Sequence, residues 1–271
     1  MSETLANAPL EGGETPAAVP PPLVTLRSVG KTFDNGTRAL HGVDLTVGKG
    51  EFLSLLGPSG CGKSTILRLI SQLDSPTDGD IRWEGTAADP KRREVSFVFQ
   101  EPTLMPWAKV FDNVYLPMRL KGVGRKTAEP QIMHALESVG LADFRAAYPR
   151  ELSGGMKMRV SIARALATDP DVLLMDEPFA ALDEITRFKL NDDLLRLWDE
   201  RGWTVMFVTH SVFESVYLST RIAVMTGRPG RIAQSIEVDG PRQRTQEFRL
   251  SEGFSAIARR TSDALSKAMS A

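Results

Sequence analysis

The chain has 271 residues, of which 42% are hydrophobic, so it can bury the core of one large domain or two small ones. Its 33 basic residues nearly balance its 34 acidic residues, which argues against a surface built to bind nucleic acid or another polyanion. The single cysteine excludes an internal disulfide and fits a reducing compartment. The apolar runs are far shorter than the about 18 residues of a membrane-spanning helix, so we expect no segment that crosses a bilayer.

The N-terminal 22 residues differ in composition from the rest. They contain no Lys or Arg and no continuous apolar segment, so they do not fit a secretory signal, and we expect a disordered tail over residues 1–22. Apolar and polar residues then alternate over residues 23–29 and 39–47. This alternation is typical of strands with one exposed face and predicts a small antiparallel sheet.

A second group of strands is more strongly apolar. Short, nearly continuous apolar runs cover residues 52–56, 95–99, 172–175, 205–208 and 222–225. Helical stretches separate these runs, and this order predicts an α/β fold with a parallel sheet covered by helices on both faces.

No strand pattern appears between residues 101 and 170. This segment predicts a helical insertion in the α/β core, with breaks at Pro130, Gly140 and Pro149. The predicted helices of the insertion cover residues 126–139, 141–147 and 153–167.

Two further helices are expected after the insertion. Residues 183–200 show the apolar spacing of an amphipathic helix. The end of the chain, from about Arg242, is polar and weakly patterned, with a candidate helix over residues 255–268.

A phosphate-binding loop follows the first apolar run, where the motif requires a buried strand before it and a helix after it. Its residues are Gly57, Pro58, Ser59, Gly60, Cys61, Gly62, Lys63, Ser64 and Thr65, all candidates to bind a nucleotide. The glycines let backbone N–H groups surround the β-phosphate, Lys63 bridges the β- and γ-phosphates, and the Ser64 hydroxyl ligates Mg²⁺. A plain glycine-rich turn is the alternative interpretation.

Two carboxylates follow the apolar run at residues 172–175. Because the carboxyl ends of parallel strands lie beside such a loop, we expect Asp176 to hold Mg²⁺ through water. Glu177 points in another direction and is the candidate general base for the water that attacks the γ-phosphate. The alternative is that this acidic pair, followed by Pro178, caps a helix.

Two other polar residues end neighbouring strands. Gln100 lies where the helical insertion begins, so it can contact Mg²⁺ and the attacking water while its loop moves with the insertion. His210 can hydrogen-bond the γ-phosphate and position the same water. Read alone, the first is an ordinary surface residue and the second a structural histidine, so both hypotheses depend on the surrounding motifs.

An aromatic residue precedes the phosphate loop in the sequence. Phe33 can stack on the adenine ring of a nucleotide. The alternative for this side chain is packing in the core.

A second anion-binding helix terminus is predicted at residues 152–156. Ser153 is followed by Gly154, Gly155 and a run of good helix formers, which indicates a helix whose first N–H groups and dipole face outward. The phosphate loop already has a helix N-terminus of its own. We therefore expect one phosphate to be clamped between two copies of the chain arranged head to tail.

In this order, the motifs resemble the ATP-binding subunit of ABC transporters over residues 23–240. The resemblance implies a RecA-like P-loop NTPase core, an antiparallel β subdomain, a helical subdomain at about residues 101–168 and a C-terminal extension over residues 241–271. It also implies ATP and Mg²⁺ as cofactors, with Ser153, Gly154 and Gly155 contacting the γ-phosphate of the ATP held by the partner subunit.

Two segments resemble a narrower group, the subunits of nitrate, sulfonate and taurine importers. They are residues 100–107, which end at Trp107, and residues 227–231. This resemblance implies an ATPase subunit at the cytoplasmic face of the inner membrane that drives import through a separate permease, with a solute-binding protein as an indirect partner. Trp107 is then the candidate edge of the permease-docking groove, although tryptophan is more often a core residue; the solute stays unassigned.

Two other functions fit parts of the sequence. One is a soluble ABC ATPase of translation or DNA repair, but such proteins carry two cassettes or a long coiled-coil insertion, and neither is present here. The other is a nucleotide-binding regulatory module without turnover, which the intact Glu177 and His210 disfavour.

The chain departs from the family pattern at four positions. Met158 replaces a glutamine, which removes a side-chain amide behind the start of the predicted helix over residues 153–167, and Phe33 replaces a tyrosine. Ser211 and Thr220 stand where aspartate is common. None of these residues supplies the hydrolysis chemistry, so we expect activity to survive.

Overall fold

The computed structural model describes residues 20–90, 93–241 and 244–270. The predicted disordered tail lies outside the described residues over 1–19, but its last residues are structured. Strand β1 (Pro22–Thr32) begins inside the predicted tail, and the Lys49 N–H donates a hydrogen bond of 2.8 Å to the Pro21 carbonyl. The tail prediction therefore extended too far, because prolines fit the start of a strand.

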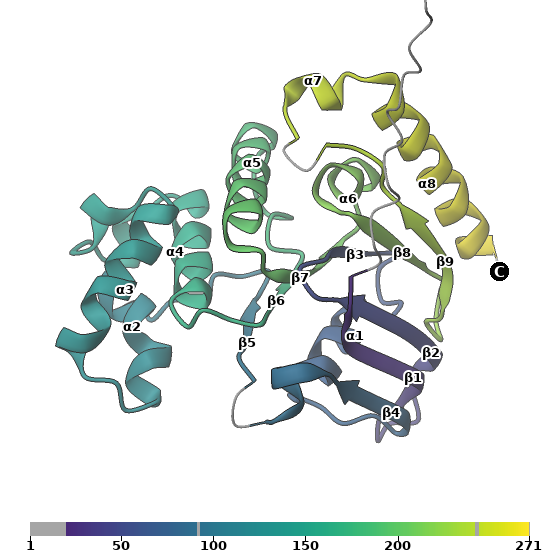
Figure 1. The fold of residues 1–271 in the computed structure, drawn as a ribbon, viewed down its shortest axis with the longest axis horizontal. Helices are drawn as coiled ribbons and strands as arrows, with labels where there is room; N and C mark the ends of the chain where they lie inside the picture. Colours follow the sequence, from purple (N-terminus) through teal and green to yellow (C-terminus); the bar gives the residue numbers. More distant parts are fainter. Residues whose placement is uncertain (1–19, 91–92, 242–243, 271) are drawn as a thin grey trace, which may run out of the picture.

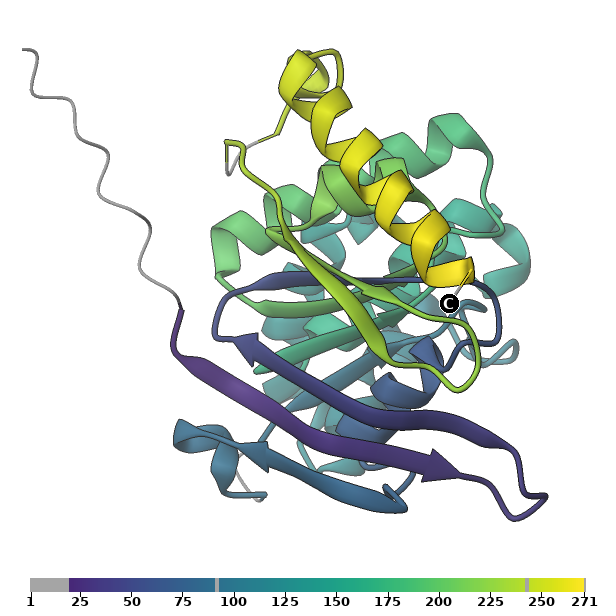
Figure 2. The ribbon, with the colours of Figure 1, turned by 90° about the vertical axis from the view of Figure 1, so that its right-hand side faces the viewer.

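A three-stranded antiparallel sheet contains the first two predicted strands. Its order is β2-β1-β4, with β2 at Arg38–Gly48 and β4 at Asp78–Trp83 (Figure 2). Strand β4 was not predicted, because it opens on Asp78, Gly79 and Asp80, residues that rarely occur in strands.

The larger sheet carries the five apolar runs. Its order is β5-β6-β7-β3-β8-β9, and all neighbouring pairs up to β8 are parallel, as predicted. The strands are β3 (Phe52–Leu56), β5 (Val95–Val98), β6 (Val172–Asp176), β7 (Thr204–Thr209), β8 (Arg221–Met225) and β9 (Ile232–Glu237). One edge strand was not predicted: β9 follows the five apolar runs and lies antiparallel to β8.

Both faces of this sheet are covered. In β3, Phe52 and Leu56 belong to one apolar cluster, whereas Leu53 and Leu55 belong to another. The first cluster includes residues of α5 (Glu184–Arg201), α6 (Val212–Leu218) and α8 (Glu252–Ser270). The second includes α1 (Lys63–Ile70) and the three-stranded sheet. Burial on both sides explains why these strands read as continuous apolar runs.

The segment between β5 and β6 is helical and extends to one side of the sheet (Figure 1). It contains α2 (Val110–Leu120), α3 (Arg125–Ser138), α4 (Gly154–Leu166) and the 3₁₀ turns η2 (Ala142–Phe144) and η3 (Pro149–Glu151). Helix α2 was missed because Pro117 lies inside it, and the predicted helix over residues 141–147 is only the short turn η2. The expected break at Pro130 is absent, since α3 runs through it with Ile132 and Leu136 buried.

The C-terminal part is more ordered than its composition predicts. Helices α7 (Gln246–Arg249) and α8 (Glu252–Ser270) follow β9, and α8 lies across β9 in Figure 2. The candidate helix over residues 255–268 was therefore too short. Its buried positions are at helical spacing, but small residues make the stripe inconspicuous: Phe254, Ile257, Ala258, Thr261, Ala264 and Ala268.

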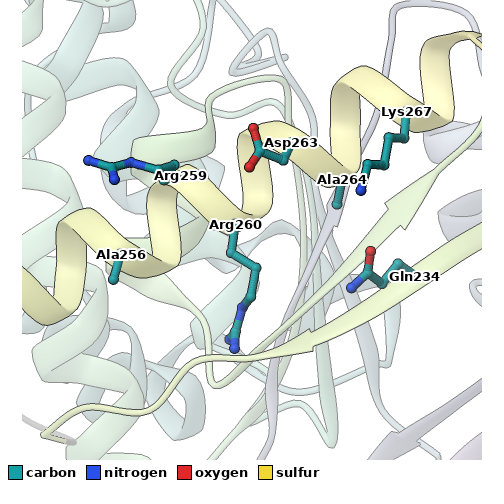
Figure 3. Close-up of a pocket in the computed structure, with 7 residues that line it drawn as sticks. All are labelled: Gln234, Ala256, Arg259, Arg260, Asp263, Ala264 and Lys267. Carbon is teal, nitrogen blue, oxygen red and sulfur yellow. The ribbon is translucent and has the colours of Figure 1, made fainter.

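A pocket of about 370 Å³ lies between α8 and β9 (Figure 3). Its polar lining includes Gln234, Arg259, Arg260 and Lys267, and Arg260 donates to the Glu237 carbonyl.

None of the helices in the described part of the chain combines the length and the apolar character needed to span a membrane.

Candidate functional site

The phosphate loop connects β3 to α1 at the carboxyl edge of the larger sheet. Gly60 and Gly62 have φ angles of +73° and +102°, a region that favours glycine. A Cβ atom on Gly62 would lie 2.6 Å from Leu40 Cδ2, so a side chain does not fit there. Gly62 is the N-cap of α1 and makes no side-chain cap hydrogen bond, which leaves the helix N-terminus suited to a phosphate.

Lys63 places a buried positive charge inside this loop. Its Nζ donates to the carbonyls of Gly57 and Pro58, at 2.8 and 3.0 Å. The same atom lies 4.0 Å from Glu177 Oε1. The loop lysine and the predicted general base therefore face one another across the site.

Ser64 and Asp176 are in direct contact. The Ser64 hydroxyl donates a hydrogen bond of 2.9 Å to Asp176 Oδ1. Burial raises the pKa of Asp176, and the hydrogen bond from Ser64 opposes that shift. A hydroxyl and a carboxylate side by side are hard oxygen donors of the kind that Mg²⁺ prefers, so this pair fits the predicted ion.

Glu177 is held in an unusual backbone conformation. Its φ is +45°, and its N–H donates to the Val208 carbonyl of the next strand at 3.1 Å. Its Oε2 lies 3.5 Å from His210 Nδ1. The helix-cap alternative for the acidic pair does not hold, because Asp183 caps the following helix by accepting from the Thr186 N–H at 2.9 Å.

Gln100 is exposed just beyond the end of β5, the strand beside β6. The structure places it at the same edge as Asp176, without a hydrogen bond between the two among the described contacts. Residue Arg164 of α4, which sequence reasoning missed, donates to the Pro102 and Thr103 carbonyls at 3.1 and 2.9 Å. It thereby fastens the segment after Gln100 to the helical part.

Phe33 is exposed in the turn between β1 and β2, so the core-packing alternative does not hold. The residue is 38% exposed, and the Lys31 ammonium lies 5.4 Å from its ring centroid. The strand after this turn approaches the phosphate loop, since the Leu40 side chain limits the space at Gly62. An aromatic face is thus available near the loop.

Residues 153–155 form the N-terminus of α4, as predicted from the sequence. The Ser153 hydroxyl accepts from the Met156 N–H at 3.3 Å, and Ser153 and Gly154 are exposed. Figure 1 shows α4 well apart from α1. The two predicted anion-binding termini are therefore both present, but they do not meet within one chain.

Comparisons with known proteins agree with this geometry. The family model described as ABC transporter matches residues 40–180. An uncharacterized ABC transporter ATP-binding protein of Methanocaldococcus jannaschii is 48% identical over 213 residues, covering 78% of this chain and 80% of that protein. The chain belongs to the ABC transporter family. It is an ABC ATPase subunit of a transporter, so the predicted family and enzyme class are confirmed.

Other matches support the fold of this ABC ATPase. An aliphatic sulfonates import ATP-binding protein of Bacillus cereus is 40% identical over 240 residues, covering 88% of this chain and 93% of that protein. The solved dimeric ATP-binding cassette MJ0796, bound to ADP and Pi, aligns with a TM-score of 0.69 at 35% identity, over 81% of this chain and 100% of that one. The predicted fold class is confirmed.

Two departures of this ABC ATPase from the family pattern keep local hydrogen bonds. Ser211 caps α6, because its hydroxyl accepts from the Glu214 N–H at 3.2 Å. The Thr220 hydroxyl donates to the Phe52 carbonyl at 3.1 Å. Met158 is buried in the apolar cluster of the helical part, where a thioether packs without needing a partner.

Trp107 of the ABC ATPase is 76% exposed and is not a core residue. It lines a groove of about 460 Å³ together with Tyr115 and Arg119 of α2. The buried Asn113 side chain, which sequence reasoning also missed, accepts from the Met105 N–H at 2.7 Å and donates to the Ala108 carbonyl at 3.1 Å. This amide fixes the loop that carries the tryptophan.

Proposed function

We propose that the protein is the ATPase subunit of an import system and works at the cytoplasmic face of a membrane as a peripheral partner of a separate permease. The observation that carries this proposal is the coexistence of the ATP site at the sheet edge with an exposed aromatic groove on the helical part. Similarity to the sulfonate import subunit of Bacillus cereus across 88% of the chain supports import rather than another use of ATP.

In the proposed site, each residue acts on the triphosphate of ATP. Lys63 and the N-terminus of α1 bind the β- and γ-phosphates, and Phe33 stacks on adenine. Ser64 and Asp176, with Gln100 at the same edge, hold Mg²⁺, which neutralises charge on the phosphates when it is bound.

Two residues act on the attacking water. Glu177 accepts the proton of that water, and His210, 3.5 Å from the carboxylate, hydrogen-bonds the γ-phosphate and holds the water in line. The Lys63 ammonium lies 4.0 Å from Glu177 Oε1, so the proposed base and the phosphate-loop lysine adjoin the same space.

ATP is proposed to bind between two copies. Because residues 153–155 and the phosphate loop of one chain lie apart, the exposed terminus of α4 is available to the ATP of the partner subunit. The solved cassette MJ0796 is dimeric with ADP and Pi, which supports this arrangement.

The Trp107 groove is proposed to receive the permease. It lies on the helical part, and Arg164 connects that part to the segment after Gln100. A change at the ATP site can thus reach the groove through the hydrogen bonds of Arg164 and Asn113.

A charged residue introduced into the groove tests whether the permease docks there and stimulates ATP hydrolysis. We expect Trp107→Glu to abolish solute-stimulated ATP hydrolysis in vesicles that contain the permease, while basal hydrolysis by the isolated chain stays unchanged. Leu250→Glu, at a side chain 79% exposed in the C-terminal part, is the matched control. Stimulation that survives Trp107→Glu would contradict docking at this groove.

The solute is proposed to be a small sulfonate, taurine or nitrate. Uptake of each labelled solute is measured in cells that lack the gene and carry either the wild-type chain or Glu177→Gln. Uptake of a sulfonate that only the wild-type chain restores would support the proposal, and equal uptake of all solutes by both strains would contradict it.

A further inference from the structure

A buried carboxylate that the proposed reaction does not use lies behind His210. Glu214, in the first turn of α6, is 9% exposed, and its Oε2 accepts a hydrogen bond from the Thr209 hydroxyl. The same hydroxyl accepts from the Ser211 N–H at 3.0 Å. Glu214 therefore fixes the residues on both sides of the histidine.

A small cavity lies beside the Glu214 carboxylate. Among the described residues, neither Glu214 Oε1 nor Arg187 Nε has a hydrogen-bond partner, although both atoms are buried. Both side chains line one cavity of about 10 Å³, which also borders Glu177 and His210. A space of this size is at the lower limit for holding one water molecule, and a bridging water would give both atoms a partner.

Charge favours the same arrangement. Burial raises the pKa of Glu214, whereas the hydrogen bond from Thr209 and the nearby Arg187 guanidinium lower it. A guanidinium N–H and a carboxylate oxygen offer one donor and one acceptor, which a single bridging water can match.

Arg187 also contacts Leu182, which lies next to the N-terminus of α4 in space. Its Nη2 donates to the Leu182 carbonyl at 3.0 Å. A Cβ atom on Gly154 would lie 3.8 Å from Leu182 Cδ2, and one on Gly155 would lie 2.7 Å from Thr186 Cγ2. Leu182 and Thr186 therefore lie close to residues 154–155, so Arg187 is connected to the N-terminus of α4 through Leu182.

We propose that Arg187 and Glu214 hold one water molecule between them and act as positioning residues. Together they tie the His210 turn to Leu182 and, through it, to the exposed terminus of α4. The inference rests on the proposed function, in which His210 and residues 153–155 both act on ATP.

The water itself is tested without any activity. A crystal structure of the full chain, at a resolution that shows ordered water, is expected to contain one peak within hydrogen-bonding distance of Arg187 Nε and Glu214 Oε1. The peak should be absent in Glu214→Leu. A wild-type structure without this peak, or with the two side chains paired directly, would overturn the proposal.

The positioning role is tested by a double-mutant cycle on ATP hydrolysis. Glu214→Leu and Arg187→Met are each expected to lower kcat by about 10- to 100-fold with little change in KM, because binding is kept while the histidine is misplaced. The double variant should be no slower than the slower single variant, since both changes remove the same bridge.

A conservative variant and a control separate positioning from folding. Glu214→Gln keeps an oxygen toward the cavity and should recover most of kcat, whereas Glu129→Gln, at an exposed site of α3, should change nothing. Additive losses in the cycle, or a lower unfolding midpoint in urea with unchanged kcat, would refute the positioning role. A wild-type chain that hydrolyses ATP without driving uptake would contradict import alone and leave this test intact.

Discussion

At the scale of single residues, the site depends on how Glu177 is presented. Its backbone lies in the left-handed region at φ +45°, a conformation that a non-glycine residue adopts at some cost. The hydrogen bond from its N–H to Val208 holds this turn beside β7. The carboxylate thereby lies between Lys63 and His210, the position of the proposed general base.

Replacing Glu177 by glutamine tests the general base. We expect Glu177→Gln to reduce steady-state ATP hydrolysis by about 10²- to 10⁴-fold, because the amide cannot accept the proton, while ATP binding is retained. Phosphate release and ATP affinity are the two measurements. Hydrolysis near the wild-type rate would show that another group is the base.

Replacing Lys63 by alanine tests ATP binding rather than hydrolysis. Lys63→Ala should weaken ATP binding, since it removes the buried cation of the proposed phosphate site. Titration calorimetry with ATP measures this directly. Unchanged affinity would exclude the loop as the phosphate site.

Cys61 lies inside the phosphate loop but is buried. The residue is 1% exposed, and burial raises the pKa of its thiol. Because the thiolate is the reactive form, we expect alkylation to be slow at neutral pH and to accelerate as the pH rises. Rapid modification at pH 7, followed by mass spectrometry, would contradict this burial.

At the scale of elements, the strands that could be predicted are those buried on both faces. The run at residues 52–56 is buried throughout and almost entirely apolar, so the sequence predicts it as a strand. In β9 only Ile236 is buried, so its sequence lacks the apolar pattern of a strand. Helix α8 was underestimated for a similar reason, since three of its buried positions are alanines. Large apolar side chains make a buried element predictable from sequence, whereas buried alanines do not.

The packing of α8 can be measured. Phe254 is buried and meets the Phe248 ring edge-on, with the ring centroids 5.6 Å apart. We expect Phe254→Ala to lower the free energy of unfolding by about 3–5 kcal/mol, because a large side chain leaves a cavity. Urea unfolding checks this, with the exposed Leu250→Ala as control; equal stability of both variants would mean that α8 does not pack firmly.

At the scale of the whole molecule, the sheet brings distant motifs to one edge. The parallel order β6-β7-β3 places Asp176, His210 and the phosphate loop together, and this could be predicted because each follows an apolar run. The contacts of Arg164, Asn113 and Glu214 could not be predicted. They depend on tertiary neighbours that no local pattern reveals.

Because α4 and α1 lie apart in one chain, the central claim is that two chains assemble around ATP. The account requires Ser153 of one chain to meet the ATP of the partner subunit. The most direct measurement is the sedimentation of Glu177→Gln with and without ATP, alone and combined with Ser153→Glu, whose carboxylate would repel the γ-phosphate. We predict an ATP-dependent dimer for Glu177→Gln, and a monomer that still binds ATP, more weakly than the dimer, for the double variant. A dimer that persists in the double variant, or a Glu177→Gln chain that stays monomeric with ATP, would contradict a site shared between two chains.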